Sequence, residues 1–378
     1  MGAIGSGKSN ALYHLVSGIK NNMTENDAMI VFDTKGDYIS KFYAKNDSVI
    51  ALDRSGDYSY KTWNIFKDIE IEKKEMRYLA ADEIISTLFQ PSIMRTQNPF
   101  FPKAAKDVVL AIVINMLENS NDPSNFDLKN ALFNRNKFDE IIQQLKSDDE
   151  WSWILDYLPE KTQQAAGVKG EIYQVMRPIL QGPFGERGDF SVRKFVRDRQ
   201  GRALFLEYSV NTSMVLKPLY SVLYDLAIKE VLSSNSIKGR IFFIIDEFSL
   251  LPYLQYIENG INFGRDRGAR FVISAQNMNQ IVDIYGEAKA KSIVSGVGTL
   301  IVFRLYDKLS REMVSSKYGQ AIKKVSWMSR KQQEGYKDQV ILSNVIEDAD
   351  LSILKTGESI ICSPTPPPFM FKFTKYHQ

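Results

Sequence analysis

The feature that most constrains this chain is a glycine-rich pattern at its start, Gly2-x4-Gly7-Lys8-Ser9, which matches the phosphate-binding consensus G-x-x-x-x-G-K-[ST] in full. Glycines in such a loop let successive backbone N–H groups converge on phosphate oxygens, and the helix that follows adds the positive end of its dipole. A loop of this kind joins a strand to a helix, so the pattern predicts an α/β fold. Chance alone produces it in about one chain in a hundred of this length, given average glycine usage, so it needs support from elsewhere.

The chemistry of phosphate binding assigns roles to the residues of this loop. Lys8 would contact the β- and γ-phosphates, and the Ser9 hydroxyl would be a ligand of Mg²⁺. No strand precedes the loop in this sequence. Because a phosphate loop is held by the strand before it, we expect the sequence to be a piece of a longer chain whose first strand is missing. The predicted nucleotide-binding residues are Gly2, Gly5, Ser6, Gly7, Lys8, Ser9 and Asn10.

A second element supports the loop. Five apolar residues, Ile241 to Ile245, run directly into Asp246 and Glu247. Such a run predicts a strand buried on both faces, and its carboxyl end is where ligands bind in open α/β sheets. Asp246 is suited to the Mg²⁺ site, and Glu247 to polarising the attacking water. The alternative is a strand followed by a solvated acidic turn; the complete loop upstream favours the catalytic interpretation.

Two further segments hold candidates for the same reaction. The predicted strand 270–274 is followed by Gln276, which could sense the γ-phosphate and orient water; taken alone, a polar residue at a strand end is usually turn chemistry. Just before that strand, Arg265 or Arg267 could reach the γ-phosphate of a neighbouring subunit as an arginine finger. A solvated arginine-rich loop explains the same residues equally well. Asp33, at the end of an earlier predicted strand, could tune the site or simply cap a turn.

The rest of the chain alternates predicted strands with helices, which indicates a doubly wound parallel sheet. Helical spacing is clearest over 10–19 and 213–232. Residues 71–188 differ, because they show helical spacing and no convincing strand; we predict an all-α insertion domain there, within a nucleotide-binding domain formed by 1–70 and 189–378. The polar stretch 307–341 is expected to include a mobile loop. The predicted strands are 28–32, 48–52, 203–208, 241–245, 270–274, 299–303 and 359–362.

Composition excludes several classes of protein. Lys and Arg number 48 against 45 Asp and Glu, a net charge of +3 that rules out a histone-like protein but not a local basic groove. One such groove could be formed by the arginine-rich stretch 187–202, for which a solvated helix face is the alternative. A single cysteine, Cys362, rules out a disulfide framework, and two histidines argue against a histidine metal site. No run of about 18 apolar residues indicates a membrane span.

Taken in order, the motifs resemble those of the cytoplasmic part of conjugative type IV secretion coupling proteins of the TraD/TrwB type. The phosphate loop and the Asp-Glu pair are shared by many motor ATPases, whereas the ordered set around a helical insertion is more specific. The resemblance covers nearly the whole chain. It rests on Gly2–Ser9, Val31–Phe42, Trp63–Phe66, Gly188–Ser191, Ile245–Phe248, Gly264–Arg265, Ala275–Gln276, Asp283–Gly286 and Ser315–Gly319.

This resemblance implies a RecA-like P-loop NTPase, a DNA-stimulated ATPase that uses ATP and Mg²⁺. Family members form hexameric rings, pass DNA with its bound relaxase to secretion-channel proteins, and bind DNA without sequence specificity. They lie on the cytoplasmic side of the bacterial inner membrane, held by an N-terminal anchor that is absent from this sequence. Two alternatives stay open: a related secretion ATPase without DNA translocation, and a nucleotide-binding docking scaffold for cargo.

Overall fold

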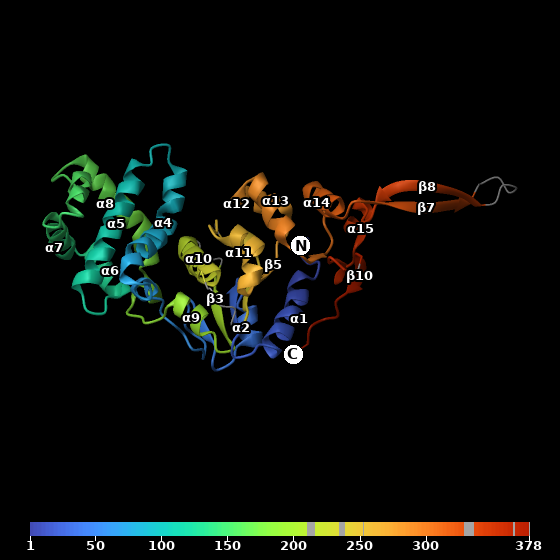
Figure 1. The fold of residues 1–378 in the computed structure, drawn as a ribbon, viewed down its shortest axis with the longest axis horizontal. Helices are drawn as coiled ribbons and strands as arrows, with labels where there is room; N and C mark the ends of the chain where they lie inside the picture. Colours follow the sequence, from blue (N-terminus) through green and yellow to red (C-terminus); the bar gives the residue numbers. More distant parts are fainter. Residues whose placement is uncertain (210–215, 234–238, 252, 329–335, 366, 378) are drawn as a thin grey trace. The chain divides into compact units, whose positions relative to one another are not determined.

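The computed structural model describes residues 1–209, 216–233, 239–251, 253–328, 336–365 and 367–377. The chain forms two compact units. One contains Asn22–Ile245 and Leu250–Val272, and the other contains Met1–Asn21, Asp246–Ser249 and Ile273–Gln378. Each unit is described by itself, and Figure 1 shows the elements of both.

The first unit is built on a parallel sheet of five strands in the order β2-β3-β1-β4-β5. Its centre is β1 (Ala28–Asp33), all six residues of which are buried. This strand pairs in parallel with β3 (Arg202–Glu207) and β4 (Ile241–Ile245), and β2 (Ser48–Ile50) pairs with β3. The order ends with β5 (Ala269–Ile273). The apolar runs therefore form the buried sheet that their composition predicts, and the five predicted strands are confirmed within two residues at each end.

Helices surround this sheet. The longest near it, α10 (Lys217–Ser233), is buried along most of its length and contacts α4, α9 and α11. The predicted helix 213–232 thus agrees from residue 217 onward; residues 213–215 lie outside the described part. Shorter helices are α2 (Asp37–Phe42), α3 (Ile65–Glu70), α9 (Val192–Asp198), α11 (Ile257–Phe263) and the 3-10 helix η6 (Gly264–Arg267).

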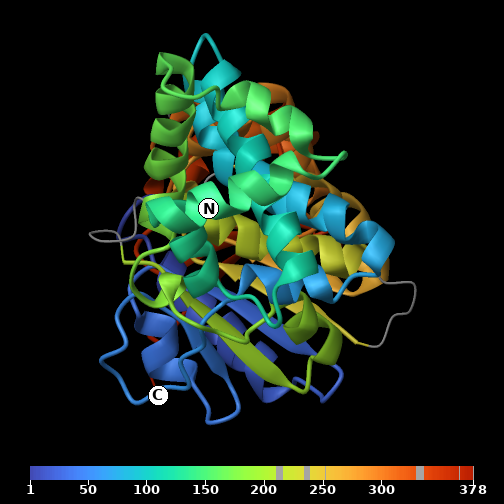
Figure 2. The same ribbon diagram turned by 90° about the vertical axis from the view of Figure 1, so that its left-hand side faces the viewer.

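Residues 71–188, all of which the structure describes, form no strand, as predicted. Helix α5 (Phe100–Asn119) is the centre of this region: most of its residues between Pro102 and Met116 are buried, and it contacts α4, α7 and α8. Figures 1 and 2 show these helices as one bundle, cyan to green, beside α10. Bundle and sheet belong to one compact unit, so domain boundaries at 71 and 188 stay a prediction. The remaining elements are η1 (Lys74–Met76), α4 (Arg77–Arg95), α6 (Asn125–Phe133), α7 (Arg135–Lys146), η2 (Ser152–Tyr157), α8 (Gln163–Ile179) and η3 (Gly182–Gly185).

The second unit joins α1 (Lys8–Asn21) to the C-terminal part of the chain. Its sheet has three antiparallel strands in the order β10-β9-β6, covered by a small apolar core around Val302, Val314 and Leu351. A separate hairpin is formed by two nine-residue strands, β7 and β8. The elements are η5 (Phe248–Leu250), α12 (Met278–Tyr285), α13 (Glu287–Gly296), β6 (Leu300–Val302), α14 (Lys308–Tyr318), β7 (Gln320–Met328), β8 (Tyr336–Asn344), α15 (Asp348–Ile353), β9 (Glu358–Cys362) and β10 (Phe369–Lys372).

One prediction for this C-terminal part was wrong, and a second is not tested by the described residues. The strands expected at 299–303 and 359–362 exist, but they pair antiparallel in the small sheet rather than joining the parallel one. A short apolar run does not specify its partner or its direction, because those depend on long-range packing. The stretch 307–341, expected to include a mobile loop, forms α14 and the β7–β8 hairpin; its residues 329–335 lie outside the described part. Among the described helices, none combines the length and the apolarity needed to cross a bilayer.

Candidate nucleotide-binding site

The phosphate loop folds as its glycines predict. Gly5 and Gly7 have positive φ angles of 71° and 112°, a region that glycine adopts at little cost. A Cβ atom added to Gly2 would lie 2.6 Å from the Cβ of Phe303, and one on Gly7 would lie 3.1 Å from the backbone of Gly357. Helix α1 begins at Lys8, directly after the loop. Gly5 is therefore required for its backbone conformation, Gly2 for close packing, and Gly7 for both reasons.

The lysine of the loop is folded back onto it. Its Nζ donates hydrogen bonds to the carbonyl oxygens of Gly2 at 2.5 Å and Ala3 at 3.0 Å. The Ser6 hydroxyl donates to the same Ala3 carbonyl at 2.7 Å. The ammonium group is thus held beside the backbone that the motif assigns to phosphate binding, and it would exchange these carbonyls for phosphate oxygens when a nucleotide binds.

The Asp-Glu pair follows β4, as predicted, and Glu247 contacts the candidate sensor. The Gln276 amide donates from Nε2 to Glu247 Oε2 at 3.2 Å, and the Ser249 hydroxyl donates to Glu247 Oε1 at 2.8 Å. Asp246 is buried. The Phe248 N–H donates to the Ser274 carbonyl at 2.9 Å, which ties the turn after β4 to the residues that follow β5. Glu247 and Gln276 therefore form one acid–amide pair.

The loop and this pair are neighbours within the second unit. The Gly2 N–H donates to the carbonyl of Ala275, the residue before Gln276, at 3.2 Å. Both charges act on the Met1 α-amino group. Burial and the charge of Lys8 lower its pKa, the charge of Glu247 opposes them, and the result is a pKa of about 5. Lys8 and Glu247 thus act on a common point at the start of the loop.

Three residues that sequence reasoning missed complete the loop's surroundings. The Gly357 N–H donates to Ser6 O at 2.9 Å, and the Thr356 hydroxyl donates to Gly5 O at 3.3 Å. Phe303, just after β6, packs against Gly2. All three are more than 290 positions away from the loop, so only the fold reveals them; a Thr-Gly turn before an apolar strand was the one available signal.

Asn10, predicted to bind nucleotide, is engaged by the C-terminal segment. Its amide Nδ2 donates to Thr374 O and its Oδ1 accepts from the Tyr376 N–H, both at 2.7 Å. His14, one turn further along α1, lies 3.0 Å from the same Thr374 oxygen through Nε2. The C-terminal segment therefore runs along the first turns of α1, and a nucleotide role for Asn10 stays a prediction.

The other predicted residues differ in how they are held. Arg265, the predicted arginine finger, lies exposed in η6, and Arg267 is half-buried in the same turn. Asp33 accepts hydrogen bonds from the N–H groups of Tyr38 and Ile39 at 2.9 and 3.0 Å, so it caps α2, as the simpler interpretation held. No three His, Cys, Asp or Glu side chains gather as a metal site in the described part of the chain. Ser9 lies in the first turn of α1, and a role for Ser9 and Asp246 as ligands of Mg²⁺ stays a prediction.

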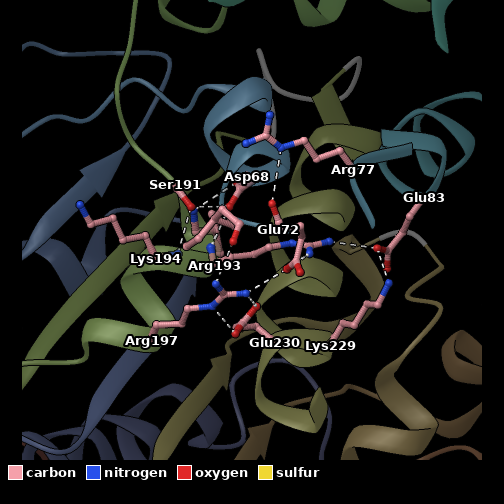
Figure 3. Close-up of polar contacts among 12 residues, drawn as sticks. Asp68, Glu72, Arg77, Glu83, Ser191, Arg193, Lys194, Arg197, Lys229 and Glu230 are labelled. Carbon is pink, nitrogen blue, oxygen red and sulfur yellow. Dashed lines mark hydrogen bonds and ion pairs between the residues drawn. The ribbon is translucent and has the colours of Figure 1, made fainter. Parts of the chain in front are cut away.

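The two arginines of α9 in the stretch 187–202 are neutralised by carboxylates, so they supply no free charge to the basic groove that was one of two interpretations of this stretch. Arg193 is buried and pairs with Glu72 at 2.6 Å and Glu83 at 3.0 Å. Arg197 is held by Glu230 at 2.6 Å and by Glu72 at 2.9 Å. Figure 3 shows these side chains pointing toward one another between α4, α9 and α10. Composition counts charges but not their partners, and here the carboxylates come from distant segments.

The chain matches a family of known proteins over most of its length. The family model described as "Type IV secretion-system coupling protein DNA-binding domain" matches residues 1–348. Coupling protein TraD of Escherichia coli (strain K12) is 22% identical over 335 residues, which cover 84% of this chain and 43% of TraD. Protein VirD4 of Agrobacterium fabrum (strain C58) is 22% identical over 198 residues, covering 50% of this chain and 29% of VirD4. The chain thus spans less than half the length of these curated relatives.

Among solved structures, the plasmid coupling protein TrwB in complex with ADP and Mg²⁺ has a TM-score of 0.76 and 21% identity, with 100% of this chain and 84% of that one covered. At this identity the likeness establishes the fold. The prediction of a RecA-like α/β fold is confirmed by it and by the central parallel sheet.

Proposed function

The chain belongs to the type IV secretion-system coupling protein DNA-binding domain family, and from that premise we propose that it is an ATP-hydrolysing motor that couples a DNA–relaxase substrate to a type IV secretion channel. The observation that carries this proposal is the hydrogen bond between Gln276 and Glu247 beside a complete phosphate loop. A motor needs to couple the presence of a γ-phosphate to a structural change, and an acid–amide pair at a strand tip is suited to that coupling.

The loop fits a nucleotide for reasons internal to this chain. Side chains are excluded at Gly2 by Phe303 and at Gly7 by Gly357, so the backbone itself faces the ligand. The Lys8 ammonium, which donates to two carbonyl oxygens of the loop, would donate to phosphate oxygens once a nucleotide binds. Gly2, Gly5, Ser6, Gly7 and Ser9 would contribute the remaining backbone and hydroxyl groups.

Hydrolysis would use the same residues in distinct roles. Lys8 would offset the charge that develops on the transferred phosphoryl group, and Ser9 and Asp246 would hold Mg²⁺, which neutralises phosphate charge when bound. Glu247 would polarise the attacking water. Gln276 would hold Glu247 in place through its amide and respond to the γ-phosphate. Arg265, exposed in η6, would reach the site of a neighbouring subunit in a hexameric ring.

The partners proposed for this motor are DNA bound without sequence specificity, a relaxase, and secretion-channel proteins. The family description of a DNA-binding domain and the relatives named coupling protein support this assignment. The DNA path would have to use residues other than Arg193 and Arg197, because carboxylates already neutralise both. We propose that the protein lies on the cytoplasmic side of the bacterial inner membrane.

The proposal is tested by ATPase rates of the full-length protein with and without single-stranded DNA. We expect Mg²⁺-dependent hydrolysis that rises with added DNA. Lys8→Ala and Glu247→Gln should each reduce kcat by about 100-fold or more, because each removes a group used in phosphoryl transfer. Gln276→Ala should reduce kcat about 10-fold and leave the affinity for ADP within about two-fold, because its amide acts on Glu247 and on the γ-phosphate, which ADP lacks.

Asn279→Ala is the matched control, since this side chain is exposed on α12, three residues from Gln276. Unchanged turnover in both Lys8→Ala and Glu247→Gln would contradict the assignment. Hydrolysis without DNA stimulation would favour a secretion ATPase that does not translocate DNA. Nucleotide binding without hydrolysis would favour a docking scaffold for cargo.

A further inference from the structure

A row of aromatic side chains joins three elements of the helical bundle. It runs from Tyr78 of α4 through Trp151, Trp153 and Tyr157 of the η2 region to Phe100 of α5. Successive ring centroids are 5.9, 6.4, 5.7 and 5.9 Å apart. Such spacings are those of directly packed aromatic pairs. These five residues, here called the aromatic row, therefore form one continuous packed cluster rather than isolated rings.

One ring of the row is buried, and three are exposed. Trp151 is 4% exposed, whereas Tyr78 and Trp153 are each 44% exposed and Phe100 is 39% exposed. The Trp153 indole N–H donates to the Glu150 carbonyl at 2.9 Å, which fixes the orientation of the ring. Exposed aromatic rings that are held rigidly lose little conformational entropy on binding, and Trp and Tyr are the residues most enriched at binding hot spots.

Carboxylates accompany the row. Residues 147–160 contain five Asp or Glu and no Lys or Arg, although Lys146 and Lys161 flank the segment. Four of the five are exposed, and none of these four side chains forms a hydrogen bond or ion pair within the part of the chain that the structure describes. Lys106 of α5 is already bound by Asp82 and Asp107, and Lys103 is exposed in the first turn of that helix. The four exposed carboxylates are Asp149, Glu150, Asp156 and Glu160.

We propose that the aromatic row and these four carboxylates form a docking surface for a basic segment of a partner protein, one in which Arg or Lys alternates with apolar residues. Guanidinium groups stack on indole and phenol rings and form ion pairs with carboxylates, so both halves of the surface would be used at once. Charge complementarity selects this partner, because a nucleic acid would bring phosphates against uncompensated carboxylates. The surface acts independently of the nucleotide site.

The test measures binding of a fluorescent peptide of alternating arginine and leucine to the full-length protein by fluorescence anisotropy. Trp153→Ala should weaken binding at least about 10-fold, as truncation of a hot-spot tryptophan does. The double variant Asp149→Lys/Glu150→Lys should weaken it further and remove most of its dependence on salt. Asp149 and Glu150 are exposed, so their replacement should leave the fold intact. The double variant therefore tests the surface even if Trp153→Ala loosens the packing of the row.

Two control variants lie on the same bundle outside the surface. Glu118→Lys reverses a charge at the other end of α5, a 20-residue helix that is about 30 Å long. Tyr173→Ala removes an exposed ring that packs on Phe133 of α6. Both should bind the peptide within about two-fold of the unchanged protein, since hot-spot effects are local. Equal losses in the controls, or no loss in either surface variant, would overturn the proposal. So would single-stranded DNA or a glutamate–leucine peptide whose binding depends on Trp153.

Discussion

At the scale of single residues, buried charges in this protein find counter-charges on segments far away in the sequence. Asp27 is the clearest example. Its carboxylate accepts from the Thr24 N–H and hydroxyl at 2.9 Å each, and from the Arg240 N–H, 213 positions away, at 2.7 Å. Arg240 Nη2 also lies 3.1 Å from Asp27 Oδ2. The carboxylate therefore ties the start of β1 to the start of β4.

Asp27 gives the protein a defined dependence of stability on acid. Burial alone would raise the pKa of its carboxyl, but hydrogen bonds from Arg240 and Thr24 outweigh burial and lower the pKa to about 2. A carboxyl whose folded pKa lies below its unfolded value of about 4 stabilises the fold above that value. This stabilisation is lost as the pH falls from about 4 to about 2.

We expect Asp27→Ala to lower the free energy of unfolding at neutral pH by about 3 kcal/mol, because it leaves several buried donors unpaired. The difference between the two proteins should shrink as the pH falls below about 4. Urea unfolding over this pH range measures it, and Asp198→Ala, at an exposed carboxylate, serves as the control. A difference that stays constant down to pH values of about 2 would contradict the assigned pKa.

Arg193 carries a second prediction at this scale. Its guanidinium contacts two carboxylates and is 5% exposed, whereas the adjacent Lys194 is exposed (Figure 3). Arg193→Ala should lower the free energy of unfolding by about 3 kcal/mol, because it removes a buried guanidinium and leaves Glu72 with Arg197 alone and Glu83 with Lys229 alone. Lys194→Ala should change it by less than about 0.5 kcal/mol. Chemical denaturation compares the two variants. Equal losses of unfolding free energy would show that the ion pairs of Arg193 do not stabilise the fold.

At the scale of elements, the sequence predicted the features that depend on neighbouring residues and missed those that depend on distant contacts. The run Ile241–Ile245 predicted β4 with both of its limits, because five apolar residues before an acidic pair leave little choice. Strands β6 and β9 were found as elements but given the wrong partners, since pairing depends on contacts across the chain. The β7–β8 hairpin was missed altogether: Lys323 and Lys324 interrupt the alternation that marks a strand.

The candidate site divides in the same way. Lys8, Asp246, Glu247 and Gln276 are recognisable because motifs assign chemistry to each of them. The residues that enclose the loop, such as Phe303 and Gly357, carry no motif, and their role is a property of packing alone. Arg193 shows the opposite case: its charge suggested contact with DNA, whereas its burial gives it a structural role.

The loop and helix α1 together offer a test of this packing. Gly2→Ala places a methyl group 2.6 Å from the Phe303 Cβ, an atom that cannot move without the backbone, so the loop must shift. Gly18→Ala adds the same methyl group on α1, with no heavy atom within 4 Å of it.

We expect Gly2→Ala to weaken binding of a fluorescent ATP analogue about 10-fold, because the backbone donors of the loop are misplaced. Gly18→Ala should leave binding unchanged and add up to about 1 kcal/mol of stability. Equal affinities in both variants would mean that the loop tolerates displacement.

At the scale of the whole molecule, the proposed function requires more than one copy of the chain. Glu247 and Gln276 form their pair within one subunit, whereas Arg265 is exposed in η6 and is assigned to a neighbour's site. In a ring each site then contains residues from two subunits, as heterologous interfaces provide. Activity would depend on how subunits are arranged around the ring as well as on how many are intact.

Mixing two inactive variants distinguishes this arrangement from catalysis within one subunit. Glu247→Gln lacks the residue that polarises water, and Arg265→Ala lacks the proposed finger, so each alone should be inactive in full-length hexamers with DNA. In an equal mixture half of the subunits keep Glu247, and half of their neighbours keep Arg265. About one quarter of the sites therefore regain both groups, and we expect the ATPase rate to recover to about a quarter of the normal value.

An arginine acting within its own subunit leaves no complete site in any mixture, so a rate that stays at the level of the separate variants would reassign Arg265. Arg270→Ala is the control, because the Arg270 guanidinium donates to the carbonyls of Arg265 and Ala269 in its own chain. When Arg270→Ala is mixed with Glu247→Gln, the ATPase rate should be no higher than the average of the two separate rates.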